Sequence, residues 1–418
     1  MNYRSRFDQP TNQLPISQGI LRFKCLPLLV RRTDDIVSNS IIMYYSSAML
    51  YRTKSPIPKS KLPILEKSTR PKPPEDLPML FKLTLIPGLK PVVLNEVSKY
   101  SDLNITENGE DKIYLDFVSD FTNILTLRSI TNAYVVKRGE KFNPYFVCNH
   151  KSILGDLIEI VLGKKEDKIK QVFKTFKLRC AGSDSKEVKE IQSYINNTYK
   201  LTESDDADLE IYISKPNELW EISVRLTPRP LSLRDYRVAN IKGGLNPTIA
   251  YAINTYCNLN NKQSYLNVFS GSGTLLIEAG LSNPDLKLVG FDVDGKNNAL
   301  AIQNIKKAGL IKQIHLKTAN IYNKPHLGKF DIIASDLPFG MQISSKENLE
   351  SLYKSFTEYC EETLNENGTL LVYTTEHKLL QNILESSKFN TIKTTDLVIS
   401  TSVAGTYLYP RIFVCKFK

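Results

Sequence analysis

The stretch Leu266-Asn-Val-Phe-Ser-Gly-Ser-Gly-Thr-Leu-Leu-Ile-Glu-Ala-Gly280 begins as an apolar strand, turns through a loop with two glycines and continues with helical spacing. Gly271 and Gly273 allow the backbone to approach a ligand at the carboxyl edge of a sheet, where the N–H groups of the next helix point. A dinucleotide-binding fingerprint needs a third small residue at position 276, which here is Leu276. The stretch therefore predicts the first unit of an α/β fold with a ligand at this edge, and it disfavours pyrophosphate binding.

The residues that follow repeat the same alternation of short apolar strands and helical stretches. Strands are expected at 264–269, 286–291, 315–318, 331–335 and 369–373, with a final pair near 394–399 and 409–416. Strands that alternate with helices in this way form a doubly wound, mostly parallel sheet. We therefore expect residues 237–418 to form an α/β domain of this kind.

Two smaller α+β stretches precede this domain. The expected elements are a strand at 80–85, a helix at 91–100 and a strand at 112–117, then a helix at 183–199 and strands at 208–214 and 220–226. A connector rich in proline, lysine and arginine runs from Lys54 to Pro78, where regular structure is disfavoured. We predict four parts, which are an extension with its linker at 1–77, modules at 78–150 and 151–236, and the α/β domain at 237–418.

The charge of the chain favours an anionic partner. Its 418 residues include 55 Lys and Arg against 44 Asp and Glu, a formal net charge of +11. The segment from Lys164 to Arg179 interleaves basic residues with Phe173 and Phe176, which suits phosphate contact and base stacking. The alternative is an amphipathic helix with a solvated lysine face. The candidate nucleic-acid contacts of this segment are Lys168, Lys170, Lys174, Lys177 and Arg179.

Cysteine and histidine usage excludes other classes of protein. The six cysteines are far apart without a C-x-x-C pair, and the four histidines have no metal-ligand spacing. We expect no disulfide framework, no metal and no membrane span, and a monomer in the reducing cytoplasm. The basic first 33 residues leave an organelle transit segment as the alternative location.

The second strand of the α/β domain ends in an acid. Asp292 lies 19 residues beyond Gly273, at a position where a carboxylate can accept both hydroxyls of a ribose. Asp294, two residues further on, is the alternative. The carboxyl edge of the sheet is therefore expected to hold both a loop that a ligand can approach closely and a candidate acceptor for sugar hydroxyls.

The fourth strand runs through Phe330-Asp-Ile-Ile-Ala-Ser-Asp336-Leu337-Pro338-Phe339-Gly340, so it delivers a carboxylate to the same edge. The exocyclic amine of a nucleobase is a poor nucleophile because its lone pair is delocalised. If Asp336 and the backbone carbonyl of Leu337 accept its two N–H bonds, the nitrogen is oriented and its developing positive charge is stabilised. Pro338 restricts the backbone, and Phe339 can stack on the base for about 1–3 kcal/mol. The motif predicts chemistry on a nucleobase amine, the alternative being a helix cap beside a core phenylalanine.

The glycine loop, Asp292 and the Asp336 motif together resemble class I S-adenosylmethionine-dependent methyltransferases that act on amino nitrogens. The segment Arg234-Asp-Tyr-Arg-Val238, followed by Leu245-Asn-Pro-Thr-Ile-Ala-Tyr-Ala252, resembles the connection between a THUMP domain and the methyltransferase domain of RNA guanine 2-amino methyltransferases. The resemblance covers about residues 78–418. It implies a Rossmann-like methyltransferase domain at 237–418, behind a ferredoxin-like module at 78–150 and a THUMP module at 151–236.

The resemblance also implies a cofactor, a substrate and site residues. It implies S-adenosylmethionine without a metal, and tRNA held by its acceptor stem and 3′ end. The Asp-Leu-Pro-Phe-Gly form is similar to the subgroup that methylates guanosine at the sixth nucleotide of that stem. We also expect Arg234 and Arg237 to bind RNA. The expected cofactor residues are Asn267, Phe269, Ser270, Gly271, Ser272, Gly273, Thr274, Asp292, Val293, Asn320 and Asp336, and the expected catalytic residues are Asp336, Leu337, Pro338 and Phe339.

Two residues depart from the family pattern. Asn267 and Asn320 stand where the family commonly has acids, so these side chains can hydrogen-bond a cofactor without charge assistance. The alternatives are guanine N2-methylation at another RNA position, methylation of an adenine amine, and an RNA-binding protein without catalysis. Adenine enzymes more often present asparagine at the position of Asp336, which disfavours the second alternative.

Overall fold

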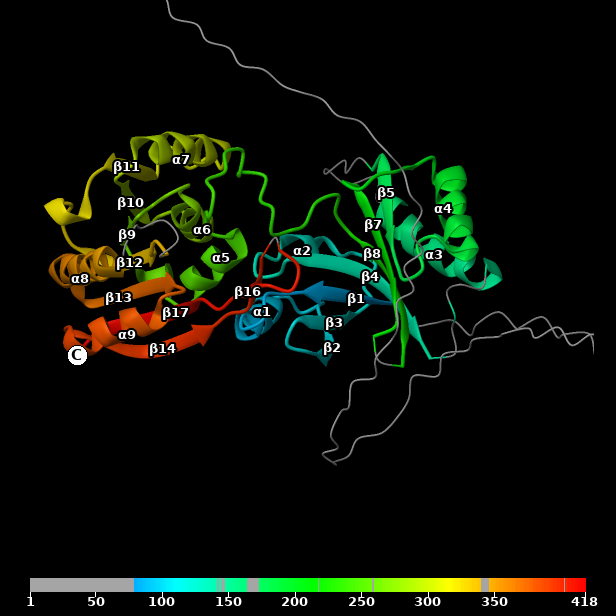
Figure 1. The fold of residues 1–418 in the computed structure, drawn as a ribbon, viewed down its shortest axis with the longest axis horizontal. Helices are drawn as coiled ribbons and strands as arrows, with labels where there is room; N and C mark the ends of the chain where they lie inside the picture. The colour runs from blue at the N-terminus through cyan, green and yellow to red at the C-terminus, as the bar shows by residue number, and fades with distance from the viewer. Residues whose placement is uncertain are drawn as a thin grey trace, which may run out of the picture. The chain divides into compact units, whose positions relative to one another are not determined.

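The computed structural model describes residues 79–140, 143, 147–163, 173–216, 218–257, 259–339, 346–401 and 403–418. These residues form two large sheets, each with its own helices, and a small two-stranded sheet (Figure 1). The predicted extension and linker at 1–77 lie outside the described residues.

The front sheet joins both predicted α+β stretches. Its eight strands have the order β2-β3-β1-β4-β8-β7-β5-β6. Because β4 and β8 pair in antiparallel register, the two stretches share one continuous sheet, and the predicted boundary after residue 150 falls inside helix α3. The strands are β1 (Met79–Thr84), β2 (Ile105–Asn108), β3 (Lys112–Asp116), β4 (Asn132–Gly139), β5 (Thr175–Arg179), β6 (Thr202–Glu203), β7 (Leu209–Ser214) and β8 (Trp220–Arg225).

Four helices bury one face of the front sheet. They are α1 (Lys90–Val97), α2 (Thr122–Thr126), α3 (Val147–Gly163) and α4 (Lys186–Tyr199). Side chains alternate across a strand, so Phe81 and Leu83 of β1 join the helices in the core whereas Lys82 faces the other side. There the Lys82 Nζ lies 2.6 Å from Glu221 Oε1, and Tyr114 donates to Glu221 Oε2 at 2.7 Å. Desolvation lowers the pKa of Lys82 despite this pairing.

The second sheet confirms the predicted doubly wound α/β fold. Its order is β11-β10-β9-β12-β13-β17-β14, and the contacts from β11 to β13 are all parallel. The strands are β9 (Ser264–Val268), β10 (Lys287–Asp292), β11 (Ile314–Thr318), β12 (Phe330–Asp336), β13 (Leu364–Thr374), β14 (Phe389–Asp396) and β17 (Arg411–Phe417). The strand expected near 394–399 begins earlier, at Phe389, and ends at Asp396.

Helices cover both faces of this sheet, so the central strands are buried. The helices are α5 (Pro247–Thr255), α6 (Thr274–Ser282), α7 (Gly295–Lys307), α8 (Lys346–Thr363) and α9 (His377–Ser386), with short 3₁₀ turns at Leu259–Asn261 and Ile321–Asn323. Strands β15 (Ile399–Ser400) and β16 (Tyr407–Leu408) pair between β14 and β17. No described helix combines the length and apolar character needed to cross a membrane. The parallel strands end at one edge, where the predicted loop and acids meet.

Candidate active site

A cavity of about 420 Å³ lies where β9, β10 and β12 end. Every predicted cofactor residue except Gly273 lines it, as do the four predicted catalytic residues. The structure therefore brings together side chains that the sequence placed on three separate strands, as expected at the carboxyl edge of a parallel sheet.

The glycine loop between β9 and α6 has a constrained backbone. Gly271 and Gly273 have φ values of 50° and 77°, and Phe269, which is not a glycine, has a φ of 57°. Gly273 does not line the cavity; it is the residue before α6 and lets the chain turn into the helix. A non-glycine residue in the left-handed region is uncommon and clusters at functional sites. The loop conformation therefore supports a ligand-binding role for this edge.

Asp292 braces this loop. Its Oδ2 accepts a hydrogen bond from the Gly271 amide at 2.9 Å, and its Oδ1 accepts from the Asp294 amide at 3.0 Å and from Asn297 Nδ2 at 3.2 Å. Asp294, the alternative sugar acceptor, also lines the cavity, and it caps α7 by accepting from the Lys296 amide at 2.8 Å. Asp292 therefore combines a position in the cavity with control over the loop shape.

The two asparagines that depart from the family pattern are engaged in different contacts. Asn267 is buried under the cavity, where its Nδ2 donates to the Ala334 carbonyl at 2.9 Å and ties β9 to β12. Asn320 is exposed at the cavity wall and accepts from the Tyr322 amide at 3.1 Å. Asn267 therefore supports the sheet edge, whereas Asn320 orders the turn after β11.

Asp336 ends β12 deep in the cavity. Its Oδ1 is enclosed and has no hydrogen-bond partner among the described residues, whereas both oxygens of Asp292 accept hydrogen bonds from the protein. Burial raises the pKa of Asp336 to about 8. An enclosed acceptor without a hydrogen bond destabilises a folded protein, and a ligand that donates a hydrogen bond to this oxygen would remove that destabilisation.

The residues after Asp336 are held by β13 and α8. The Leu337 amide donates to the Tyr373 carbonyl at 3.0 Å, and the Phe339 ring meets the Tyr373 ring edge-on at a centroid distance of 6.1 Å. Tyr353 of α8 donates to the Pro338 carbonyl at 3.1 Å and also contacts Thr374 Oγ1 at 2.7 Å. The backbone and ring of the motif are therefore fixed before any ligand binds.

Sequence analysis missed several residues of this site. Tyr353 and Tyr373 belong to a helix and a strand whose sequences carry no motif, so only the fold reveals their role. The segment 241–245, Ile-Lys-Gly-Gly-Leu, also lines the cavity, and Gly244 lies near Ser272 of the glycine loop. Its two adjacent glycines before the Asn246 cap of α5 were a loop signal that could have been used.

The predicted basic segment is only partly described. Lys168 and Lys170 lie outside the described residues. Lys174 is exposed, and the Lys177 Nζ lies 2.9 Å from Asp205 Oδ1, a pairing that raises the pKa of Lys177. Arg179 NH2 lies 3.0 Å from Glu210 Oε1.

The stacking role suggested for Phe176 is wrong. Residues 175–179 form strand β5, and Phe176 and Leu178 alternate into the core of the front sheet. Phe173 is partly buried against the same core. The basic residues therefore project from a strand and the turn before it, without an aromatic partner from Phe176.

The two arginines of the connecting segment lie in different environments. Arg234 has an 11% exposed side chain, and its three guanidinium nitrogens donate to Glu278 Oε1 and to the carbonyls of Leu231 and Arg128. These contacts contradict the prediction that Arg234 binds RNA, because its donors are engaged inside the protein. Arg237 is half-buried near Gly244 at the cavity, and its Nε is enclosed without a partner among the described residues.

Comparison with protein families matches residues 234–404 to the RMKL-like methyltransferase domain. A tRNA (guanine(6)-N2)-methyltransferase of Archaeoglobus fulgidus is 24% identical over 367 residues, which cover 78% of this chain and 90% of that protein. The human U6 snRNA (guanine-N(2))-methyltransferase THUMPD2 is 31% identical over 147 residues, 34% of this chain but only 28% of that protein.

Solved structures share the fold. TrmN from Thermus thermophilus superposes with a TM-score of 0.66 at 21% identity, covering 81% of this chain and all of that chain. SMU.472, a methyltransferase complexed with SAH, superposes with a TM-score of 0.60 at 15% identity, covering 82% of this chain and 99% of that chain. The chain therefore shares its fold with these structures.

Proposed function

We propose that this chain, whose residues 234–404 form an RMKL-like methyltransferase domain, methylates the 2-amino nitrogen of a guanosine in RNA with S-adenosylmethionine. The observation that carries the proposal is Asp336, whose enclosed Oδ1 has no hydrogen-bond partner among the described residues and lies in a cavity shared with the Phe339 ring. An amine that donates to this oxygen would satisfy it, and the ring beside it suits a flat base.

The residues of the cavity fit the cofactor. Ser270, Gly271 and Ser272 of the glycine loop line the cavity, Ser270 Oγ is enclosed without a partner among the described residues, and Asp292 can accept ribose hydroxyls. In the described part of the chain no group of His, Cys, Asp and Glu could hold a metal ion. S-adenosylmethionine would supply an electrophilic methyl group on its sulfonium.

The protein contributes mainly orientation. Asp336 accepts one N–H of the base amine, the Leu337 carbonyl accepts the other, and Phe339 stacks on the ring. The amine nitrogen forms the new bond to the methyl carbon as the sulfur–carbon bond breaks, and the nitrogen then releases a proton to Asp336 or to solvent. Proximity and alignment account for most of the acceleration, because the methyl group is already reactive. A guanosine in a stem must first leave its stack.

The narrower proposal concerns the substrate. We propose tRNA, at the sixth nucleotide of the acceptor stem, because the Archaeoglobus relative with that name aligns over 90% of its own length. The second candidate is a small nuclear RNA, suggested by the 31% identity to the human U6 snRNA enzyme over the methyltransferase part. We also propose a monomer in the reducing cytoplasm, because the six cysteines are far apart in the sequence without a C-x-x-C pair.

Competing substrates test this proposal. Unmodified tRNA, U6 snRNA and ribosomal RNA transcripts are incubated with the protein and cofactor, and the modified nucleotide is mapped by nuclease digestion. The proposal predicts methyl incorporation in tRNA at the sixth nucleotide. Incorporation only in U6 snRNA would favour the second candidate. Binding of cofactor without transfer to any RNA would favour an RNA-binding protein without catalysis.

The pH dependence of the reaction reports on Asp336. Because burial raises its pKa to about 8, the carboxyl is mostly protonated at pH 7 and accepts N–H bonds better as the pH rises. We expect kcat/KM measured at limiting cofactor to rise between pH 6.5 and 9 and then level off. At saturating cofactor the sulfonium charge should lower the apparent pKa. Identical flat profiles in both conditions would contradict the role given to this carboxyl.

The basic segment is tested by charge reversal. Lys168, Lys170, Lys174 and Lys177, each changed to Glu, should weaken RNA binding and reduce the salt dependence, because each phosphate contact adds about 0.7–0.9 to the log–log slope. The matched control changes Lys306, Lys307, Lys312 and Lys317, which are exposed around α7 and β11, to Glu. Equal losses of RNA affinity in both variants would show that binding depends only on the net charge of the protein.

A further inference from the structure

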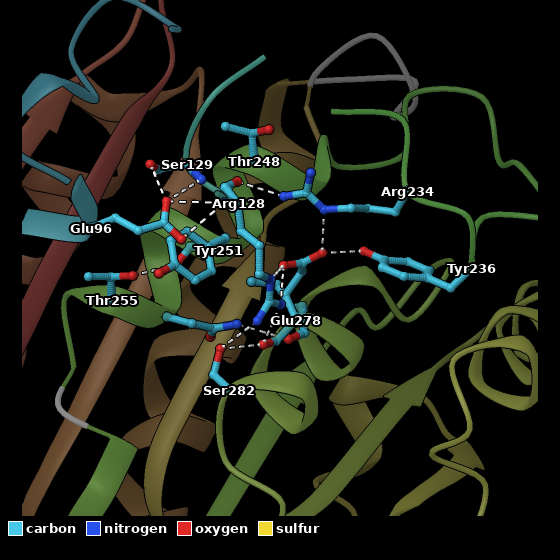
Figure 2. A network of polar contacts seen from close by, with 12 residues as sticks. Glu96, Arg128, Ser129, Arg234, Tyr236, Thr248, Tyr251, Thr255, Glu278 and Ser282 are labelled. Carbon is cyan, nitrogen blue, oxygen red and sulfur yellow. Dashed lines mark hydrogen bonds and ion pairs between the residues drawn. The ribbon is translucent and has the colours of Figure 1, made fainter. Parts of the chain in front are cut away.

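A loop of the front sheet is held against the methyltransferase domain by buried charges. The loop spans residues 127–131, between α2 and β4, and contacts helices α5 and α6 (Figure 2). Arg128 donates from Nε to Glu278 Oε2 at 3.0 Å and from NH1 to Ser282 Oγ at 3.1 Å, both on α6. Its guanidinium also lies over the Tyr251 ring of α5, 4.8 Å from the ring centre. One side chain of the front module therefore contacts both helices.

Glu278 is the centre of this cluster. Its side chain is fully buried, and besides Arg128 it accepts from Arg234 Nε at 3.2 Å and from Tyr236 OH at 2.7 Å. A buried carboxylate is stable only when it is paired and hydrogen-bonded. Here two guanidinium groups from different parts of the chain share it, as Figure 2 shows. Arg234 NH2 also donates to the Arg128 carbonyl at 2.6 Å, which closes the cluster.

A second carboxylate fixes the backbone of the same loop. Glu96 of α1 accepts hydrogen bonds from the amides of Arg128 at 3.0 Å and Ser129 at 2.8 Å. The loop is therefore held through its backbone by the front module and through the Arg128 side chain by the methyltransferase domain. Arg128 can therefore move away from Glu278 only if either the hydrogen bonds of its side chain to α6 or those of the loop backbone to Glu96 break.

An apolar contact supports the same junction. Ile86, Leu89 and Val92, around the start of α1, are buried in the core cluster of the methyltransferase domain with Leu397. Gly88 has a φ of 97°, and a Cβ there would lie 2.0 Å from the Asp396 carbonyl oxygen. The two backbones therefore meet closely at a second point, which restricts tilting about the Arg128 contact.

We propose that Arg128 is a positioning residue that, through Glu278, holds the front module in one orientation to the methyl-transfer cavity and so selects the guanosine that reaches Asp336. Glu278 lies on α6, whose first residue, Thr274, ends the glycine loop at the cavity. The front module, which the proposed function takes to bind the RNA, is thereby fixed to the helix that follows the glycine loop. The inference rests on the proposed function, because it presupposes an RNA guanosine as substrate.

The test separates orientation from folding. In the Arg128→Met variant Glu278 remains paired with Arg234 and Tyr236, so the methyltransferase domain keeps its buried charge balanced. We expect kcat/KM on full-length RNA to fall at least tenfold and methyl groups to spread to neighbouring guanosines. The affinity for S-adenosylhomocysteine should change less than threefold. Glu278→Gln removes the charge shared by both arginines, so methyl groups should spread to the same neighbouring guanosines and kcat/KM should fall further than in Arg128→Met.

Arg229→Ala is the matched control. Arg229 is a half-exposed arginine of the front module that pairs with Asp206 and lies outside the cluster, so methylation should stay at one position. An Arg128→Met enzyme with wild-type rate and a single wild-type position would overturn the inference. If wild-type protein modifies no guanosine, the proposed function fails instead. In that case, amide hydrogen exchange of residues 127–131 and of α6 tests whether Arg128 fixes the front module. Protection from exchange that is unchanged in Arg128→Met would contradict this role of Arg128.

Discussion

Methyl transfer should be abolished in Asp336→Ala and slowed by about 10²–10⁴ in Asp336→Asn, because the carboxylate orients the amine and stabilises its developing charge. The asparagine carbonyl can still accept one N–H bond but cannot carry a compensating charge. RNA affinity should stay near the wild-type value in both variants, since Asp336 lies inside the cavity. Single-turnover rates with saturating RNA and cofactor, together with equilibrium RNA binding, measure these effects. Turnover of Asp336→Ala at more than a tenth of the wild-type rate would contradict the role of this residue.

The Asp336→Asn substitution should also make the folded protein more stable. A carboxyl whose pKa is raised to about 8 by burial keeps its proton in the folded state at pH values where the unfolded chain has released it. Wild-type stability therefore decreases as the pH rises from about 4 to about 8. Asp336→Asn removes this dependence, so its advantage in melting temperature should grow over that interval, by about 2–4 °C for each kcal/mol. A variant that is less stable at pH 8 would indicate a structural role for the carboxyl.

Asp292→Ala should weaken cofactor binding by about two orders of magnitude, because it removes both a ribose acceptor and the brace on the Gly271 amide. Isothermal titration with S-adenosylhomocysteine measures this loss. The matched control is Asp294→Ala, which removes the cap of α7 and should cost about 1 kcal/mol of stability with little change in affinity. If Asp294→Ala lost affinity and Asp292→Ala did not, the two acids would have to exchange roles.

The methyltransferase domain could be predicted well because its signals are local. Most of the parallel strands contain a short apolar run, and the chemistry-bearing residues lie at the ends of β10 and β12 and in the loop after β9. Since parallel strands end at one edge, the sequence order alone brings Gly271, Asp292 and Asp336 together. The structure adds what supports them, such as Tyr353 and Tyr373, which lie far from the motif in sequence and have no distinctive pattern.

The front module shows where such reasoning fails. Strand β5 was overlooked because its basic residues suggested an RNA-binding or solvated segment, although Phe176 and Leu178 already alternate as in a half-buried strand. Arg234 was predicted to bind RNA because its segment resembles the connection between a THUMP domain and a methyltransferase domain. Its burial depends on Glu278, which is 44 residues later in the chain and belongs to the helix after the glycine loop. No local pattern reveals a pairing of that kind.

We propose that Asp336 orients the 2-amino group of guanosine for methyl transfer. The most direct test incubates the wild-type protein with methyl-labelled S-adenosylmethionine and unmodified tRNA, digests the RNA to nucleosides and identifies the labelled product by mass spectrometry. We expect guanosine carrying one labelled methyl group on its 2-amino nitrogen, and no such product from Asp336→Ala. Label on a ribose oxygen, a ring nitrogen or the amine of adenosine would contradict it.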